Sequence, residues 1–164
     1  MSIQDRQGNY QKYNSDGSTP VVVVGSLANI PVIDTWSPVV VIDEAVGNTK
    51  TFTIPTGKEW EVLNIYASLT TTAIVANRQV WVRLKTSTDV LIGGFQAVLD
   101  IPASQTKKLN FGNGLQYDMV TSLTIPMTKI VLPAGYKIVV ADVNNVTTLD
   151  TLKVYLSTMQ RTVA

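Results

Sequence analysis

The sequence predicts an all-β protein, an antiparallel two-sheet sandwich preceded by an extended N-terminal arm. Three observations lead to this fold class. Val, Ile and Thr supply 23, 12 and 20 of the 164 residues, and these β-branched side chains favour strands. From about residue 38 onward, short alternating segments recur between turns of Gly, Pro and Asn, as in sandwiches and barrels. No helical period is long enough for a crossover helix, which argues against βαβ units.

Residues 1–37 differ from the rest and are assigned to an arm and connector. Residues 7–20 are polar and rich in Gly, Asn and Ser, a composition that is disordered in isolation. A run of four valines follows, formed by Val21, Val22, Val23 and Val24. This run predicts either a buried strand or an arm strand that pairs with the sheet edge of another subunit. Residues 25–37 then connect the arm to the sandwich.

Residues 38–164 are assigned to the sandwich domain. Strands are expected near 39–43, 49–54, 59–70, 78–86, 89–99, 105–111, 119–125, 128–132, 136–142 and 151–159. The alternation of 59–70 slips once at Val62-Leu63, which predicts a bulge. Segment 72–79 has the weakest strand pattern and has room for one helical turn. Eight to ten strands suit two sheets of four or five.

Two segments of the chain echo each other. Residues 53–62 and 131–140 share an apolar residue, a Pro, a small residue and a Gly before an alternating strand. Pro followed two residues later by Gly sets a tight turn, because Gly accepts a positive φ. We interpret the two segments as equivalent corners of one sandwich.

The composition excludes several classes of chemistry. Without Cys, the chain has no disulfide, thiolate nucleophile or Cys-based metal site, and without His it lacks the usual general base. The net charge of +1 gives no basic field for nucleic acid. No window reaches the ~18 apolar residues of a membrane span, and no signal peptide is recognised. We therefore expect no catalytic residues, cofactor, metal or small-molecule substrate, and neither nucleic acid nor membrane as a partner.

Two acidic groups are weighed as sites. Glu59 and Glu61 share one face of a strand, and they are either paired carboxylates or a solvated strand face, the interpretation we favour. A second group offers oxygen ligands for a hard cation and consists of Asp142, Asn144, Asn145 and Asp150. Its spacing matches no EF-hand loop, and such residues usually serve turns.

Aromatic side chains are candidates for stacking on a sugar. The tryptophans are Trp36, Trp60 and Trp81, with Tyr66, Tyr117 and Tyr155 as helpers. Packing in the core or at a subunit interface is the favoured alternative. Trp81 is the best candidate, because it alternates with Val80 and Val82 and so faces out beside Arg83. Trp81 and Arg83 are thus the expected exposed aromatic and basic surface.

The chain resembles a family of virion proteins. The polar N-terminus Asp5-Arg6-Gln7-Gly8-Asn9 leads into the valine run, followed by the segments 54–63 (IPTGKEWEVL), 76–84 (ANRQVWVRL) and 132–138 (LPAGYKI). Together they look like the small β-sandwich virion proteins of tailed bacteriophages, which are head decoration or cement proteins and related neck, tail or fibre components. The likeness spans most of residues 1–158.

The resemblance implies a structural role in the virion without catalysis. It implies a jelly-roll sandwich that trimerises, an extended arm that fixes it to the capsid lattice, and the major capsid protein or other virion proteins as partners. Synthesis would take place in the cytoplasm of the host bacterium. Lattice or subunit attachment is expected from Tyr10, Tyr13 and the valine run. Three alternatives stay open: a neck, tail or fibre-base subunit, a carbohydrate-binding module, and an enzyme with two converging carboxylates.

Overall fold

The computed structural model describes residues 2–4, 10–12, 35–98, 100–112, 118–119, 122–143 and 149–163. The chain divides into two compact units, Met1–Ile33 and Asp34–Ala164. In the first unit, β1 (Ser2–Gln4) and β2 (Tyr10–Lys12) pair antiparallel, with Ile3 opposite Gln11. The other residues up to 34, including the valine run, lie outside the described residues.

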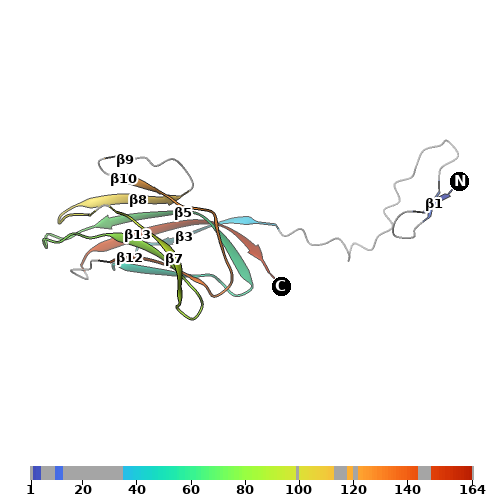
Figure 1. The fold of residues 1–164 in the computed structure, drawn as a ribbon, viewed down its shortest axis with the longest axis horizontal. Coiled ribbons are helices and arrows are strands. Elements are labelled where there is room, and N and C mark those ends of the chain that lie inside the picture. Colours follow the sequence, from blue (N-terminus) through green and yellow to red (C-terminus); the bar gives the residue numbers. More distant parts are fainter. Residues whose placement is uncertain are drawn as a thin grey trace. The chain divides into compact units, whose positions relative to one another are not determined.

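The second unit is an all-β sandwich of two sheets (Figure 1), which confirms the predicted fold class. The larger sheet contains β3 (Ser37–Asp43), β5 (Lys58–Thr70), β8 (Thr106–Gly112), β9 (Asp118–Met119), β10 (Ser122–Pro126), β11 (Ile130–Leu132) and β13 (Thr151–Thr162). The smaller sheet contains β4 (Thr49–Thr53), β6 (Val80–Lys85), β7 (Leu91–Gln96) and β12 (Lys137–Asp142). Within the described ranges there is no helix, and hence no helix that could cross a membrane.

The strand order is that of a jelly roll. The larger sheet runs β3-β13-β5-β8-β10-β9, with β11 also on β5, and the smaller runs β4-β12-β6-β7. Four antiparallel pairs are nested in the sequence: β6 with β7, β5 with β8, β4 with β12, and β3 with β13. The chain is therefore one long hairpin wrapped into two sheets, closed by the pairs β13–β5 and β12–β6.

The larger sheet departs from the expected size and direction. It has seven strands among the described residues, where four or five were expected. The excess comes from β9, β10 and β11, which lie between β8 and β12 in the sequence. β10 also runs parallel to β8, because the chain reverses through β9 and comes back between β9 and β8. One pair of an otherwise antiparallel sandwich is thus parallel.

The helical turn considered for segment 72–79 is wrong. These residues contain bends and an isolated bridge in which Arg78 pairs with Ile101. The backbone N–H of each residue donates to the carbonyl of the other, at 3.1 Å from Arg78 and 2.8 Å from Ile101. The segment is therefore held by pairing with Ile101, beyond the end of the β6–β7 ladder, rather than by local helix bonds.

The core lies between the two sheets, where alternate residues of each strand meet. In β5 the inward residues include Trp60, Ile65 and Leu69, and in β6 they are Val80, Val82 and Leu84. The predicted bulge is confirmed: Ser157 pairs with Asn64 and Thr158 with Val62, so Leu63 is the extra residue. After this bulge, alternate side chains of β5 again point toward the core.

The two predicted corners are equivalent and touch each other. Gly57 and Gly135 have φ of 69° and 79°, values that disfavour any residue with a Cβ. Each turn is closed by a backbone bond, Lys58 N to Pro55 O at 3.1 Å and Tyr136 N to Pro133 O at 3.2 Å. Ile54 joins the corners, because its N–H donates to Tyr136 O and its carbonyl accepts from Gly135 N, both at 2.9 Å.

Two ion pairs involve buried side chains of the sandwich. Lys50, which points inward from β4, pairs with Asp43 of β3 at 2.9 Å and so links the two sheets. Arg78 pairs with Asp150 at 2.8 Å between Nε and Oδ2, and both side chains are 0% exposed. Arg78 Nη1 also donates to the carbonyls of Ile74 and Ala76, each at 2.7 Å, which satisfies the buried guanidinium.

Both acids in these pairs have a lowered pKa. For Asp43 the chief cause is the hydrogen bond from Lys50. For Asp150, burial alone would raise the pKa, but bonds from the Thr72 amide and from Arg78 outweigh it. A carboxylate whose pKa is lowered in the folded state stabilises the fold at pH values above its ordinary pKa. This stabilisation is lost as the pH falls through the folded-state pKa.

We therefore expect acid-sensitive stability. The melting temperature should change little from pH 7 to about pH 5. It should decrease once the pH is below 3.8, the ordinary pKa of Asp. Circular dichroism melts at stepped pH would measure this. Asp43→Asn removes one of the carboxyl groups with a lowered pKa, so the melting temperature of this variant should fall less steeply with acid. A wild-type curve that stays flat to pH 3 would contradict the expectation.

Candidate binding surface

Trp81 and Arg83 lie on the outward face of β6, as the alternation predicted. The guanidinium carbon of Arg83 is 5.0 Å from the centroid of the Trp81 ring, a cation–π distance. In the part of the chain that the structure describes, Arg83 has no carboxylate partner. We call these two residues the Trp81–Arg83 surface.

A hollow of about 250 Å³ lies beside this surface. It is bounded by Trp81 and Arg83 on β6 and by Leu91, Gly94 and Gln96 on β7. Gly94 lies directly opposite Arg83 in the register. A Cβ at Gly94 would sit 2.4 Å from the carbonyl oxygen of Val82, so only glycine fits there. The floor of the hollow is therefore bare backbone.

Amide side chains run along one end of the hollow. Gln96 Nε2 donates to Gln79 Oε1, and Gln79 Nε2 donates to Asp100 Oδ1 at 2.6 Å. Asn77 Nδ2 donates to the other oxygen of Asp100 at 3.0 Å. This chain of bonds fixes the Gln96 side chain beside the hollow, and it engages both oxygens of Asp100.

The neighbouring acid is engaged by lysines. Asp89 is 2.8 Å from Lys137 Nζ and 3.9 Å from Lys85 Nζ. The hydrogen bond from Lys137 is the main reason that the pKa of Asp89 is lowered. Asp89 is therefore shared by two lysines, whereas Arg83 has no carboxylate partner among the described residues.

A second hollow, of about 200 Å³, lies past the end of β7. It is lined by Gln96 and Val98 on one side and by Leu123, Ile125 and Pro126 of β10 on the other. Leu123 and Ile125 are only partly buried against the core. This hollow is therefore apolar and opens where the edge of the smaller sheet meets β10.

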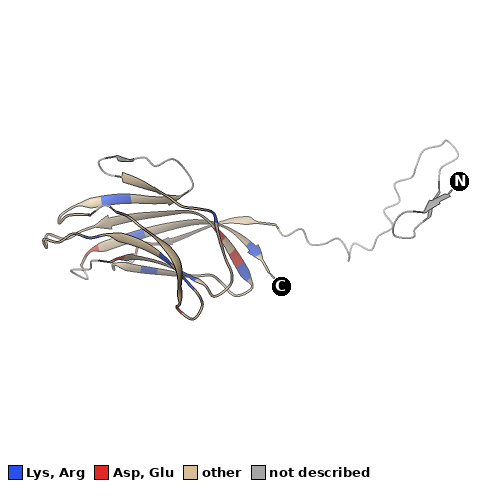
Figure 2. Cartoon of the chain, in the orientation of Figure 1, with Lys and Arg blue, Asp and Glu red and all other residues tan. Residues whose placement is uncertain are grey.

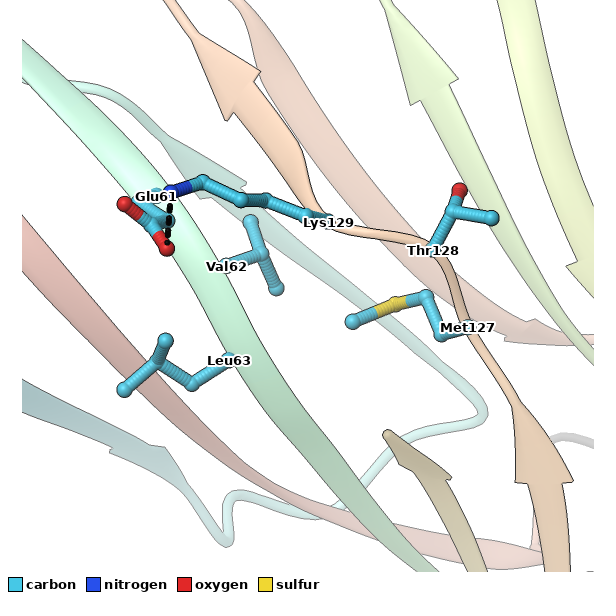
Figure 3. Close-up of a pocket in the computed structure, with 6 residues that line it drawn as sticks. All are labelled: Glu61, Val62, Leu63, Met127, Thr128 and Lys129. Atoms are coloured by element: carbon cyan, nitrogen blue, oxygen red, sulfur yellow. Dashed lines mark ion pairs between the residues drawn. The ribbon is translucent and has the colours of Figure 1, made fainter. Parts of the chain in front are cut away.

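A third hollow, of about 140 Å³, lies at the bulge of β5. Figure 3 shows Lys129 reaching back from the segment after β10 toward Glu61 of β5. Their ion pair measures 2.9 Å. Because this pair spans the hollow and matches its two charges, no charge is left over there to recognise a ligand.

The acidic candidates are engaged in ion pairs. Glu59 and Glu61 share the outward face of β5, and Glu59 pairs with Arg161 at 2.6 Å while Glu61 pairs with Lys129. The two carboxylates thus share one strand face, and each is partly buried against a cation. Asp150 of the second group is bound to Arg78, and Asn144 and Asn145 lie outside the described residues. Within the described ranges, no group of three or more His, Cys, Asp or Glu side chains could hold a metal ion.

The aromatic candidates separate into different environments. Trp60 is buried, and its Nε1 donates to Gln160 Oε1 at 3.0 Å. Trp36 packs under Arg161, with 4.9 Å between the guanidinium carbon and the ring centroid. Tyr66 and Tyr155 meet edge to face at 5.6 Å on the larger sheet. Tyr117 lies outside the described residues.

The structure does not describe the side chains of the attachment residues expected in the arm. Tyr10 begins β2, and nothing is described of its side chain. Tyr13, Val21, Val22, Val23 and Val24 lie outside the described residues. Their proposed role therefore rests on the sequence alone.

No sequence pattern predicted the first and second hollows or the chain of amide side chains. The Gly93-Gly94 doublet after an alternating strand is the only local sign of the first hollow in the sequence. The second hollow depends on β10 lying near the end of β7. Their approach depends on the unexpected parallel strand, so no local pattern could indicate it.

No family model matches the chain, and no curated protein matches it. The fold and the surface therefore define the class of this protein. It is a jelly-roll sandwich in which one edge strand of each sheet exposes apolar side chains. Val40 and Ile42 are exposed on β3, and Leu91 and Ile92 on β7.

Proposed function

We propose that this protein is a non-catalytic structural protein of a tailed-bacteriophage virion, and specifically a capsid decoration protein that binds and stabilises the head lattice. The observation that carries the proposal is the jelly-roll strand order combined with apolar side chains exposed on edge strands. Jelly rolls recur in viral capsid proteins and lectins, an analogy at the level of fold.

The distribution of charge supports an assembly role. Figure 2 shows Lys, Arg, Asp and Glu scattered over the sandwich, with long uncharged stretches between them. On the larger sheet the outward acids are matched, Glu59 by Arg161 and Glu61 by Lys129. Surfaces with few unmatched charges and exposed apolar residues are typical of surfaces that other proteins cover.

The proposed mechanism is mass action. A protein that binds only the assembled lattice stabilises that lattice in proportion to its free concentration. Oligomerisation, for which a homotrimer is the expected form, would add weak contacts through effective concentration. In this proposal residues 1–24 carry lattice attachment, and the sandwich carries oligomerisation.

The test is to purify particles of the virus that encodes this sequence and to quantify the protein by mass spectrometry. We expect it in many copies per particle. Recombinant chain should co-sediment with particles stripped of it, and chain lacking residues 1–24 should not. Absence from the particles would contradict the virion role. Binding that survives the deletion would contradict the role of the arm.

A neck, tail or fibre-base subunit is the alternative within the virion, and copy number per particle distinguishes it from a decoration protein. A carbohydrate-binding module has less support. Trp60 is buried, and the ring of Trp81 is covered by Arg83, so neither tryptophan offers an open ring face for a sugar. The Trp81–Arg83 surface is better suited to an anion.

A further inference from the structure

We propose that the free edge of β7 is a docking site for an extended segment of a partner protein that carries an acidic side chain flanked by apolar ones. The segment would add a strand to the smaller sheet. The inference concerns what binds at β7 and goes beyond the virion role, because it assigns the edge and the chemistry of its partner.

The first observation is the open backbone edge. β7 is the last strand of the smaller sheet and pairs only with β6 among the described residues. Ala97 N donates to Val80 O at 3.0 Å, which marks a hydrogen-bonded pair next to the strand. In an antiparallel ladder, hydrogen-bonded and non-bonded pairs alternate. The N–H and C=O groups of Gly94 and Gln96 therefore point away from β6, toward the free edge.

The second observation is that the edge is apolar and exposed. Leu91 and Ile92 are 58% and 51% exposed, and Val90 before them is 59% exposed. Exposed apolar edge strands are templates for pairing with another chain. Strand β7 itself contains no charged residue that would discourage such pairing.

The third observation is the gap above Gly94. A strand added beside β7 would place a side chain opposite Gly94, on the outward face. Since Gly94 has no side chain, the side chain of the added strand would have no β7 side chain between it and Arg83 on β6. Arg83 has no carboxylate partner among the described residues, and its stacking on Trp81 holds it at the hollow. An acidic side chain at this position would complement it.

The fourth observation concerns the adjacent positions. Successive side chains of a strand point to opposite faces, so the neighbours of the acidic residue would point toward the sandwich interior. There the second hollow presents Val98, Leu123 and Ile125. Main-chain bonds would supply affinity, while the two hollows would select an acidic side chain on one face and apolar side chains on the other.

The test uses the full chain and a synthetic peptide, acetyl-Ser-Val-Glu-Val-Thr-Leu-Ser-amide. In the control peptide Gln replaces Glu. Titration calorimetry should give binding of the Glu peptide about tenfold tighter than that of the Gln peptide, since a hydrogen bond to a charged group is worth about that much. Amide NMR signals of Gly94 and Gln96 should shift on binding.

Two variants distinguish a specific role of Arg83 from the loss of one positive charge anywhere on the protein. Arg83→Gln should weaken the Glu peptide about tenfold and leave the Gln peptide unchanged. Lys108→Gln, which removes an exposed cation from the larger sheet, should change neither. Melting curves would verify that both variants fold. If wild type binds the two peptides equally or binds neither, or if Arg83→Gln behaves like Lys108→Gln, the proposal is overturned.

The two proposals fail separately. Absence of the protein from virus particles would remove the virion role while leaving peptide binding at β7 intact. Absence of peptide binding would remove the docking edge while leaving the protein in the particle.

Discussion

Replacing Arg78 by Met is expected to lower the free energy of unfolding by about 3–5 kcal/mol. The side chains of Arg78 and Asp150 are both 0% exposed. Without the guanidinium, Asp150 keeps a bond from the Thr72 amide at 2.7 Å but loses its counter-charge. The carbonyls of Ile74 and Ala76 also lose their donor. A buried charge left without its partner is among the largest single-residue losses known.

Urea denaturation followed by circular dichroism would measure this loss. Arg83→Gln, on the outward face of β6, is the control and should change stability by no more than about 1 kcal/mol, the loss of its contact with Trp81. The double variant Arg78→Met/Asp150→Leu should recover much of the loss, because it removes both charges. If the single variant were as stable as wild type, the buried pair would not be holding residues 72–78 in place.

Ile65→Ala is expected to cost about 2–5 kcal/mol, whereas Ile42→Ala should cost less than about 1 kcal/mol. The two isoleucines are in the larger sheet but on opposite faces. Ile65 of β5 is 0% exposed and Ile42 of β3 is 57% exposed. The same atoms are removed in both cases, so the difference reports the cavity and lost burial alone.

Thermal or urea unfolding of the two variants would give the comparison directly. Equal losses would mean that Ile42 is covered in solution, as by a second copy of the chain. Repeating the measurement over a range of protein concentrations would then distinguish burial by association from burial within one chain.

The sequence carried enough information for the fold class but not for the sheet assignments. The alternation of Val80, Val82 and Leu84 with Trp81, Arg83 and Lys85 set the two faces of β6 correctly. The slip at Leu63 and the corners at Gly57 and Gly135 were equally local, and each appears where predicted. These features depend on neighbours within a few residues, so periodicity and turn chemistry reveal them.

What the sequence could not indicate depends on distant contacts. Arg78 and Asp150 are 72 residues apart, and nothing in either neighbourhood marks them as partners. The parallel pairing of β10 with β8 depends on a reversal between them, and seven strands gather in one sheet because of it. In the sequence, the hollow at Gly94 is marked only by two adjacent glycines, because its walls come from two strands. Its suitability for an anion depends on Arg83, which has no carboxylate partner among the described residues.

The position of β13 has a consequence for how the protein is made. β13 (Thr151–Thr162) lies between β3 and β5 and pairs with both, so an inner strand of the larger sheet is built from residues that a ribosome adds after the strands on either side. Until residues 151–162 have emerged, β3 and β5 lack a common neighbour, and inward residues such as Val41 and Ile65 have no Leu156 between them. The hairpin of β6 and β7, by contrast, can close as soon as it is synthesised. The nested strand order thus favours closure from the middle of the chain outward, with the sandwich completed only after translation has passed its last strand.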